Sequence, residues 1–572
     1  MFITTLPSYL KLSVLSLVAA LLFINEKALA QADTLTLNGT AASYVQATSV
    51  RVEGVYEVDS IDQLTPSQRS IAKSFSDGFG RTVQASQLDA APDGRDIVQP
   101  YRYLNNGQPV RGYLPYVDGS GEFFRTRATY NNSYEESEQY LFYQAADADY
   151  ATDAAPYAEA RYENSPLGRV LVSGSVGGAW QPDSGHAVTY AYRAARASDT
   201  LRFFDPDTPH LGSRNYTAAE LQQVQVTEVT DEDGQTVRSY TGRSGRTIMT
   251  EQKHAAGQYY RTYYSYDLAG RLRYTVPPRA HEILDSLGGT WDLTSSSVSQ
   301  LLFSYLYDEE GRISEARFPD KDPVYYLYDP LGRTALVQDG RLRQDSLWTF
   351  IKYDRRQRPV YSGVWKGGND RTQLQQAIDS YYANGNLRYE RESSTTAYGY
   401  TNNVYPQVPD SAVLTASYYD HYDLDRDGNG RLASDHYQAG IVQDQEAYAY
   451  ERLRGMPVAS RERILGTNDW LIKHLFYDKW GRVIQTRSNN HLETDLKDIS
   501  TVAYDFEGKP LRQQTTVYGA ADSVTTRDRF SYDHAGRVLQ VYHQVNQQPE
   551  VLVANYRYNT IGQLIGKDLH GY

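Results

Sequence analysis

The residues best suited to chemistry are three aspartates at alternate positions, Asp423, Asp425 and Asp427, followed by Gly428. This spacing matches the start of a calcium-binding loop, in which carboxylate oxygens converge on the ion and glycine makes the bend. The twelfth position of such a loop is a bidentate glutamate, whereas here it is Ser434. An acidic turn in an inserted loop explains the same residues, so we assign no metal ligand and leave calcium binding open.

Other catalytic and cofactor patterns do not occur in the sequence. It contains no His-Glu-x-x-His metal motif, no Gly-x-x-x-x-Gly-Lys-Ser/Thr phosphate loop and no Gly-x-Ser-x-Gly nucleophile elbow. The absence of cysteine excludes disulfides, thiolate metal sites and cysteine nucleophiles. The 11 histidines are scattered, and a lone one such as His186 or His534 is more typical of a surface or strand position than of a catalyst. We therefore predict no catalytic residue, no cofactor and no enzymatic activity.

The net charge and the N-terminal residues limit the partners and the cellular location that we expect for the protein. The net charge of −13 argues against a nucleic-acid partner, which requires a basic surface. Lys11, the apolar run over 12–24 and the small residues before Gln31 predict a cleaved signal peptide. A signal anchor is the alternative, but the run is shorter than the roughly 20 residues that a spanning helix needs. We expect an exported protein, periplasmic, on the cell surface or secreted, without a membrane span after cleavage.

The pattern that organises the chain is a six-residue unit, Tyr-Asp-x-x-Gly-Arg. Clear copies begin at Tyr266, Tyr307, Tyr328, Tyr477 and Tyr532, and weaker ones at Tyr353, Tyr504 and Tyr558. In the well-matched stretches, consecutive copies lie 21 to 28 residues apart, which is the length of one supersecondary unit in a repeat protein. A chain of 572 residues is also too long for one ordinary core, and an array solves that problem.

Each repeat should form a β-hairpin. In Asp-x-x-Gly, aspartate suits the first position of a type I turn, and glycine suits the last, where a left-handed backbone closes a hairpin with a bulge. Pro330 falls at the second turn position, where its fixed φ is favoured. Before the turn, Tyr260, Thr262, Tyr264 and Tyr266 alternate with other residues, which is strand periodicity. The predicted fold class is all-β: hairpin repeats that pair edge to edge into a long, curling sheet.

The arginine that ends each unit has two interpretations. A row of arginines could bind a ligand, but an arginine at this position can also pair with the turn aspartate or stack on the tyrosine of the next repeat. Because arginine recurs at this position in six of the eight copies, we favour the structural role.

We divide the chain into three regions. Residues 1–30 are the signal peptide, 31–250 an N-terminal β-rich domain with degenerate repeats such as 76–81, and 251–572 the Tyr-Asp repeat array. The repeats are diverged or interrupted near 365–475.

These units resemble the tyrosine-aspartate repeats of the Rhs family. In the N-terminal region, residues 77–81, 96–100, 113–116, 163–169 and 179–181 resemble the domain of unknown function that opens many Rhs-type proteins of Gram-negative bacteria. The resemblance implies a sheet that spirals into a hollow shell, which in some members encloses a C-terminal toxin domain.

No distinct effector domain follows the repeat at Tyr558. A truncated gene, one piece of a split system and a shell-only surface protein all remain open. The predicted function is a non-catalytic Rhs-type scaffold, with a toxin or a downstream continuation of the shell as partner. The alternative is a surface adhesin or carbohydrate-binding protein that recognises cell-surface glycans through exposed tyrosines. A polar interior would favour the shell, and an open concave face rimmed by Tyr and Trp would favour the adhesin.

Overall fold

The computed structural model describes most of the chain. The described ranges are 29–37, 40–55, 57–119, 124–130, 132–145, 150–204, 213–254, 258–287, 291–423, 437–446 and 449–570. Nearly all of the predicted signal peptide lies outside them, as do Asp425 and Asp427 of the candidate calcium loop.

The protein is nearly all β, with 44% strand and 11% helix, as the sequence predicted. The strands of the N-terminal region are β1 (Leu29–Leu37), β2 (Thr40–Val50), β3 (Arg69–Ser76), β4 (Thr82–Leu88), β5 (Asp96–Tyr103), β6 (Pro109–Tyr113), β7 (Tyr116–Asp118), β8 (Tyr157–Tyr162), β9 (Val170–Gly174), β10 (Val188–Ala194), β11 (Arg202–Phe204), β12 (Ser213–Asn215), β13 (Gln225–Thr230), β14 (Thr236–Thr241) and β15 (Thr247–Lys253). Those of the array are β16 (Tyr259–Tyr266), β17 (Leu272–Val276), β18 (Phe303–Tyr307), β19 (Ile313–Arg317), β20 (Val324–Tyr328), β21 (Thr334–Gln338), β22 (Leu347–Tyr353), β23 (Pro359–Lys366), β24 (Val413–Asp420), β25 (Leu453–Arg463), β26 (Trp470–Tyr477), β27 (Val483–Ser488), β28 (Asp498–Tyr504), β29 (Pro510–Tyr518), β30 (Ser523–Tyr532), β31 (Val538–Val545), β32 (Val551–Tyr558) and β33 (Leu564–Leu569).

Short helices interrupt this pattern. They are α2 (Val58–Ile61), α3 (Glu138–Tyr143), α4 (Ala218–Leu221), α5 (Pro278–Leu287), α6 (Ser296–Ser299), α7 (Gly340–Gln344) and α8 (Arg371–Ala383). Among the described residues, no helix has the length and apolar character needed to cross a membrane.

One antiparallel sheet contains almost every strand. Its hydrogen-bonded path runs through 30 strands in chain order, from β1 to β33, with β7 paired to β5 as a side branch and β11 and β12 forming a separate pair. Among the described strands no pairing joins β33 back to β1, so the sheet is not closed by its own hydrogen bonds.

The hairpin turns have the predicted geometry. In the turn between β20 and β21, Gly332 has a φ of +76° and its N–H donates to the carbonyl of Asp329. The register shifts by one residue between Leu327 and Tyr328, which is the expected bulge. The copy at Tyr353 has Gln357 in the glycine position, and it also adopts a left-handed φ of 64°.

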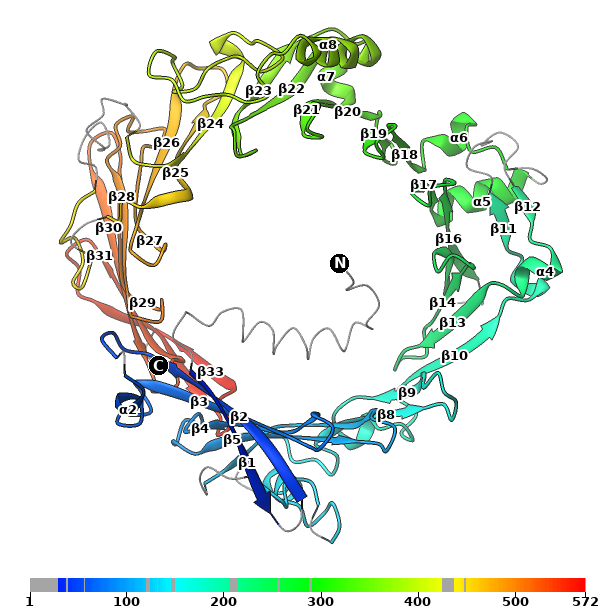
Figure 1. The fold of residues 1–572 in the computed structure, drawn as a ribbon, viewed down its shortest axis with the longest axis vertical. Helices are drawn as coiled ribbons and strands as arrows, with labels where there is room; N and C mark the ends of the chain where they lie inside the picture. Colours follow the sequence, from blue (N-terminus) through cyan, green and yellow to red (C-terminus); the bar gives the residue numbers. More distant parts are fainter. Residues whose placement is uncertain are drawn as a thin grey trace.

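Two groups of elements pack on the sheet and form the main hydrophobic cores. We call α4, α5 and α6 the first cover, and α8 with the segment that follows it the second cover. Under α4, α5 and α6, a cross-strand row of five side chains is almost fully buried; its members are Val226, Tyr240, Met249, Tyr263 and Val276. Under α8 and the segment after it, Leu336 and Phe350 of neighbouring strands pack with Leu374 and Ile378 of the helix. In Figure 1 both covers lie on the outer side of the strands.

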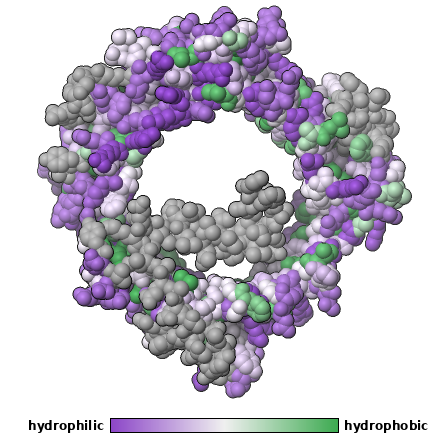
Figure 2. Space-filling view, viewed as in Figure 1, coloured by the Kyte–Doolittle hydropathy of each residue, from purple (hydrophilic) through white to green (hydrophobic). Residues whose placement is uncertain are grey.

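The long sheet bends into a ring around a central opening (Figure 1). Bending is expected because strands twist and because a bulge beside each turn increases that twist locally. The opening persists when all atoms are drawn, and the residues that border its uncovered part are mainly hydrophilic (Figure 2).

Replacing Gly332 with Val should destabilise the array by at least about 1–2 kcal/mol, because a β-branched residue resists the left-handed conformation. Thermal unfolding measures the effect. The control is Gly78→Val, since Gly78 lies in an equivalent turn, lacks a positive φ and has open space around it. Equal melting temperatures for the two variants would contradict the turn assignment.

Candidate functional site: the inter-repeat ladder and the ring closure

In seven of the turns the aspartate is locked to the arginine that follows it, whereas the turn at Asp505 has Lys509 in the arginine position. In the turn at Asp267, Oδ1 accepts from the Arg271 backbone N–H (2.8 Å) and Oδ2 from Arg271 Nε (2.7 Å). Burial opposes ionisation of Asp267, but the hydrogen bonds from Arg271 outweigh it and lower the pKa of this carboxyl. The same two contacts recur at Asp77, Asp308, Asp329, Asp354, Asp478 and Asp533.

The same arginine then reaches the next repeat. The Arg271 guanidinium lies 4.5 Å from the ring centroid of Tyr307, and the Tyr307 hydroxyl donates to the carbonyl of Leu272 (2.7 Å). Burial raises the pKa of Tyr307, so the hydroxyl keeps its proton. Equivalent stacks join Arg81 to Tyr103, Arg312 to Tyr328, Arg333 to Tyr353, Arg358 to Tyr419, Arg482 to Tyr504 and Arg537 to Tyr558. Both contacts that the sequence suggested for this arginine are present, and together they form an inter-repeat ladder.

The last described repeat keeps the ladder geometry without charge. Asn559 replaces the aspartate and Gln563 the arginine; Asn559 Oδ1 accepts from the Gln563 N–H (2.8 Å), and its Nδ2 donates to Gln563 Oε1 (3.0 Å). All these turns therefore share the same hydrogen-bonded geometry, whereas the charged pair is not present in every one.

All the ladder turns lie along one rim of the sheet. They occupy every second connection along the path, such as β3–β4, β16–β17, β20–β21 and β30–β31. In an antiparallel sheet alternate connections lie at the same end of the strands. The ladder therefore stacks continuously along this rim, while the other rim carries the remaining connections.

The sheet face opposite the first cover carries hydroxyl groups of both threonines and tyrosines, since Tyr260, Thr262 and Tyr264 of β16 share it. Met249 and Tyr263 are paired and buried under the cover, whereas the next pair in register, Thr250 and Thr262, points to the opposite face. Farther along, the hydroxyls of Ser500 and Thr515 pair across strands at 2.9 Å. Because the first cover is external (Figure 1), the Thr250 face points toward the opening. These hydroxyl groups make the interior polar, which is the feature expected of a shell.

The two ends of the sheet meet through side chains. Arg51 donates from Nη1 to the carbonyl of His534 (2.5 Å) and pairs with Glu507 (3.2 Å). Arg537 donates to the carbonyl of Ala90 (3.0 Å), and His534 Nε2 lies 2.9 Å from the carbonyl of Asp89, which can only accept. These contacts surround a small apolar cluster of Ala91, Val117 and Ile561. We call this set of contacts the ring closure.

The ring closure joins opposite rims. Residues 51–53 and 89–91 belong to the connections β2–β3 and β4–β5, which lie on the rim without the ladder. Their partners Glu507, His534 and Ile561 belong to ladder turns. The first strands of the sheet are therefore stacked on its last strands along the ring axis, as in one turn of a spiral. The strands of the two ends overlap in Figure 1.

Buried charges elsewhere serve to attach the second cover. Lys352 and Glu390 are fully buried and 3.2 Å apart, and Glu390 also accepts from the backbone N–H groups of Asn403 and Val404. Burial lowers the pKa of Lys352, and Glu390 opposes that shift. The pair thus ties the segment after α8 to β22.

A neighbouring pocket of about 390 Å³ contains four carboxylates. Each has a basic partner: Asp354 pairs with Arg358, Asp420 with Arg356 and Arg358, Glu390 with Lys352, and Glu392 with His421. Although burial opposes it, hydrogen bonding from Arg358 lowers the pKa of Asp420 to about 2. A carboxylate that stays ionised and paired is poorly suited to general acid catalysis. Among the described residues, no group of three His, Asp or Glu side chains could hold a metal ion.

Comparison with known proteins supports the fold. Residues 48–194 match the family model of DUF6443, a domain of unknown function, and this range includes the N-terminal motifs at 77–181 that predicted such a domain. No curated protein matches the chain.

Solved structures of toxin complexes share the architecture. A crystal structure of TcdB2-TccC3 aligns over 92% of this chain and 21% of that chain, with 15% identity and a TM-score of 0.51. The Tc holotoxin pore of Photorhabdus luminescens aligns over 93% of this chain and 20% of that chain, with the same identity and TM-score. The chain thus spans about a fifth of the length of those chains. The matches fit the resemblance to Rhs-type proteins and establish the fold.

The ring closure should open when its arginines are removed. We expect Arg51→Ala combined with Arg537→Ala to increase the maximum dimension measured by small-angle X-ray scattering, because both side chains bridge the two ends. The matched control, Arg271→Ala with Arg312→Ala, removes two ladder arginines far from the closure. It should lower the melting temperature without changing the maximum dimension. Identical scattering from both double variants would contradict the closure.

Proposed function

We propose that the chain is a non-catalytic Rhs-type scaffold that forms one turn of a hollow, exported shell. The observation that carries the proposal is the ring itself: one sheet surrounds an opening, with a hydroxyl-rich face inside and both covers outside (Figures 1 and 2).

The physical design suits enclosure rather than catalysis. A container wall needs a continuous sheet, a repeating lateral contact and an interior that does not adhere to its contents, and the 30-stranded sheet, the ladder and the Thr250 face have these properties. An exposed apolar interior would instead bind unfolded chains nonspecifically.

Two partners fit this wall: a toxin segment held in the opening, or a continuation of the shell stacked on its rim. Similarity to toxin-complex structures supports this choice, and the rim-on-rim contacts of the ring closure support stacking of a further turn of sheet. The predicted signal peptide supports export.

The test of enclosure uses the absence of cysteine in the native chain. The same unstructured, protease-sensitive peptide is coupled to a Thr250→Cys variant, on the inner face, and to a Ser286→Cys variant, on the external helix α5. We expect protease to cleave the peptide at position 250 several times more slowly, because the wall restricts access. Equal cleavage rates at the two positions would contradict the proposed function.

A further inference from the structure

The inner face of the ring is not polar along its whole length. On the last five strands, β29 to β33, this face carries five large aliphatic side chains that are each 38–53% exposed. They are Val517, Val524, Val545, Val551 and Leu569. We call this set of side chains the apolar stripe.

The strand before the stripe shows which way its side chains point. Thr501 of β28 is fully buried, and Gln485 donates both to its hydroxyl and to the carbonyl of Gln438, in the segment that follows α8. Thr501 therefore points to the outer side, where the second cover lies (Figure 1). Its neighbour Ser500 points inward and is paired with Thr515 of β29.

The register of the sheet carries this inner face from β29 to β33. Val517 lies two residues beyond Thr515, on the same face, and is paired with Val524. Each later member of the stripe is paired with an inner-face residue of the preceding strand. These pairs are Thr526–Val545, His543–Val551 and Ala554–Leu569. The five side chains are therefore at most one diagonal step apart and form a continuous surface.

A continuous exposed apolar surface indicates a binding site, whereas single exposed apolar residues are common on any protein. The stripe faces the opening, so a partner must lie inside the ring to cover it (Figure 1). The assignment of this partner rests on the proposed function, in which the opening holds a polypeptide. The Thr250 face is polar, so the wall would hold its contents at the stripe and leave them free elsewhere.

The shape of the stripe fits a helix that lies across the strands. Neighbouring strands are about 4.8 Å apart, so five strands span about 19 Å, which is the length of a helix of about 13 residues. A helix satisfies its own backbone hydrogen bonds on such a surface. An extended segment would need a free strand edge, but β29, β30, β31 and β32 are paired on both sides.

The charge around the stripe favours a basic partner. The chain has a net charge of −13. Asp522 is exposed in the turn that joins β29 to β30, at one end of the stripe. Asp528 lies beside the stripe on the inner face, with Oδ1 at 2.7 Å from Nδ1 of His543. Lysines or arginines on the polar side of a bound helix would complement these carboxylates.

We propose that the apolar stripe binds an amphipathic helix with a basic polar face, which belongs to the polypeptide inside the ring. The apolar face of the helix packs on the five aliphatic side chains, and its basic residues lie near Asp522 and Asp528. The stripe thus anchors the enclosed chain at one position on the wall.

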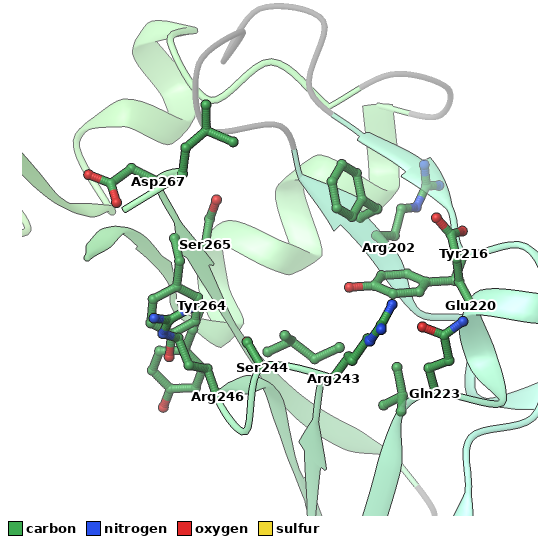
Figure 3. Close-up of a pocket in the computed structure, with 16 residues that line it drawn as sticks. Arg202, Tyr216, Glu220, Gln223, Arg243, Ser244, Arg246, Tyr264, Ser265 and Asp267 are labelled. Atoms are coloured by element: carbon green, nitrogen blue, oxygen red, sulfur yellow. The ribbon is translucent and has the colours of Figure 1, made fainter. Parts of the chain in front are cut away.

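A pocket of about 780 Å³ beside the first cover does not compete for this helix (Figure 3). Arg202, Arg243 and Arg246 line the pocket, so it repels a basic partner. In Figure 3 the side chain of Arg243 extends across the pocket toward Tyr216 and Gln223. The pocket also lies on the covered, outer side of the sheet, which a polypeptide inside the ring does not reach.

Fluorescence anisotropy of a labelled peptide mixed with the full chain tests the proposal. The probe is a peptide of about 14 residues made of leucine and lysine, with leucines at the helical spacing i, i+3, i+4 and i+7. We expect saturable binding that weakens with salt. A peptide of the same composition in alternating order should bind about tenfold more weakly. Absence of binding, or equal binding of the two peptides, would overturn the proposal.

Variants locate the site on the wall. Val524→Asp combined with Val545→Asp should weaken binding of the helical peptide about tenfold. The control is Val237→Asp on β14, since Val237 is 41% exposed and shares the inner face with Ser239, the partner of Thr250. It should leave the affinity unchanged. All three side chains are partly exposed, so both variants should keep the native melting temperature. Equal affinities of the two variants would overturn the assignment.

Two further measurements separate this inference from its alternatives. Sedimentation velocity detects a second copy as the occupant: self-association of the native chain that the stripe variant abolishes would overturn the proposal. The protease test at position 250 does not involve the stripe. Slow cleavage there without peptide binding would overturn the helix site and leave the shell intact, whereas fast cleavage with peptide binding would contradict the shell alone.

Discussion

Most hairpins of the array are joined to the next by an arginine that is fixed by its own turn aspartate and stacked on the following tyrosine. One such stack at an exposed site adds only about 0.5–1 kcal/mol, and the tyrosine hydrogen bond adds about 1 kcal/mol. A single step is therefore weak, and the array is held together because the step repeats along one rim. Asp267, Arg271 and Tyr307 show the complete unit, with distances of 2.7 Å and 4.5 Å between its groups.

This ladder constrains the shape of the whole molecule. Its contacts lie at one end of the strands, and a bulge accompanies each turn, so every hairpin adds a similar bend to the sheet. Over thirty strands the sheet bends far enough for its two ends to meet. The ends meet rim on rim because the sheet advances along the ring axis as it turns. The ring closure needs no strand pairing, and Arg51 and Arg537 complete it by donating to backbone carbonyls.

The sequence predicts the local structure well because local chemistry decides it. Asp-x-x-Gly predicts the turn, the bulge and the left-handed Gly332, and Arg after glycine predicts both contacts of the ladder. The ring closure could not be predicted in this way. Arg51 and the carbonyl of His534 are 483 positions apart, and a backbone acceptor leaves no pattern in a sequence.

The most direct test of the spiral is the distance across its ring closure. Glu53 and Lys479 lie on opposite sides and form an exposed ion pair at 2.5 Å, which contributes little to stability. Spin labels can replace both through Glu53→Cys and Lys479→Cys, since the chain has no other cysteine. Pulsed electron paramagnetic resonance should then give one short, narrow distance. A broad distribution that extends to the diameter of the ring would contradict a closed spiral turn.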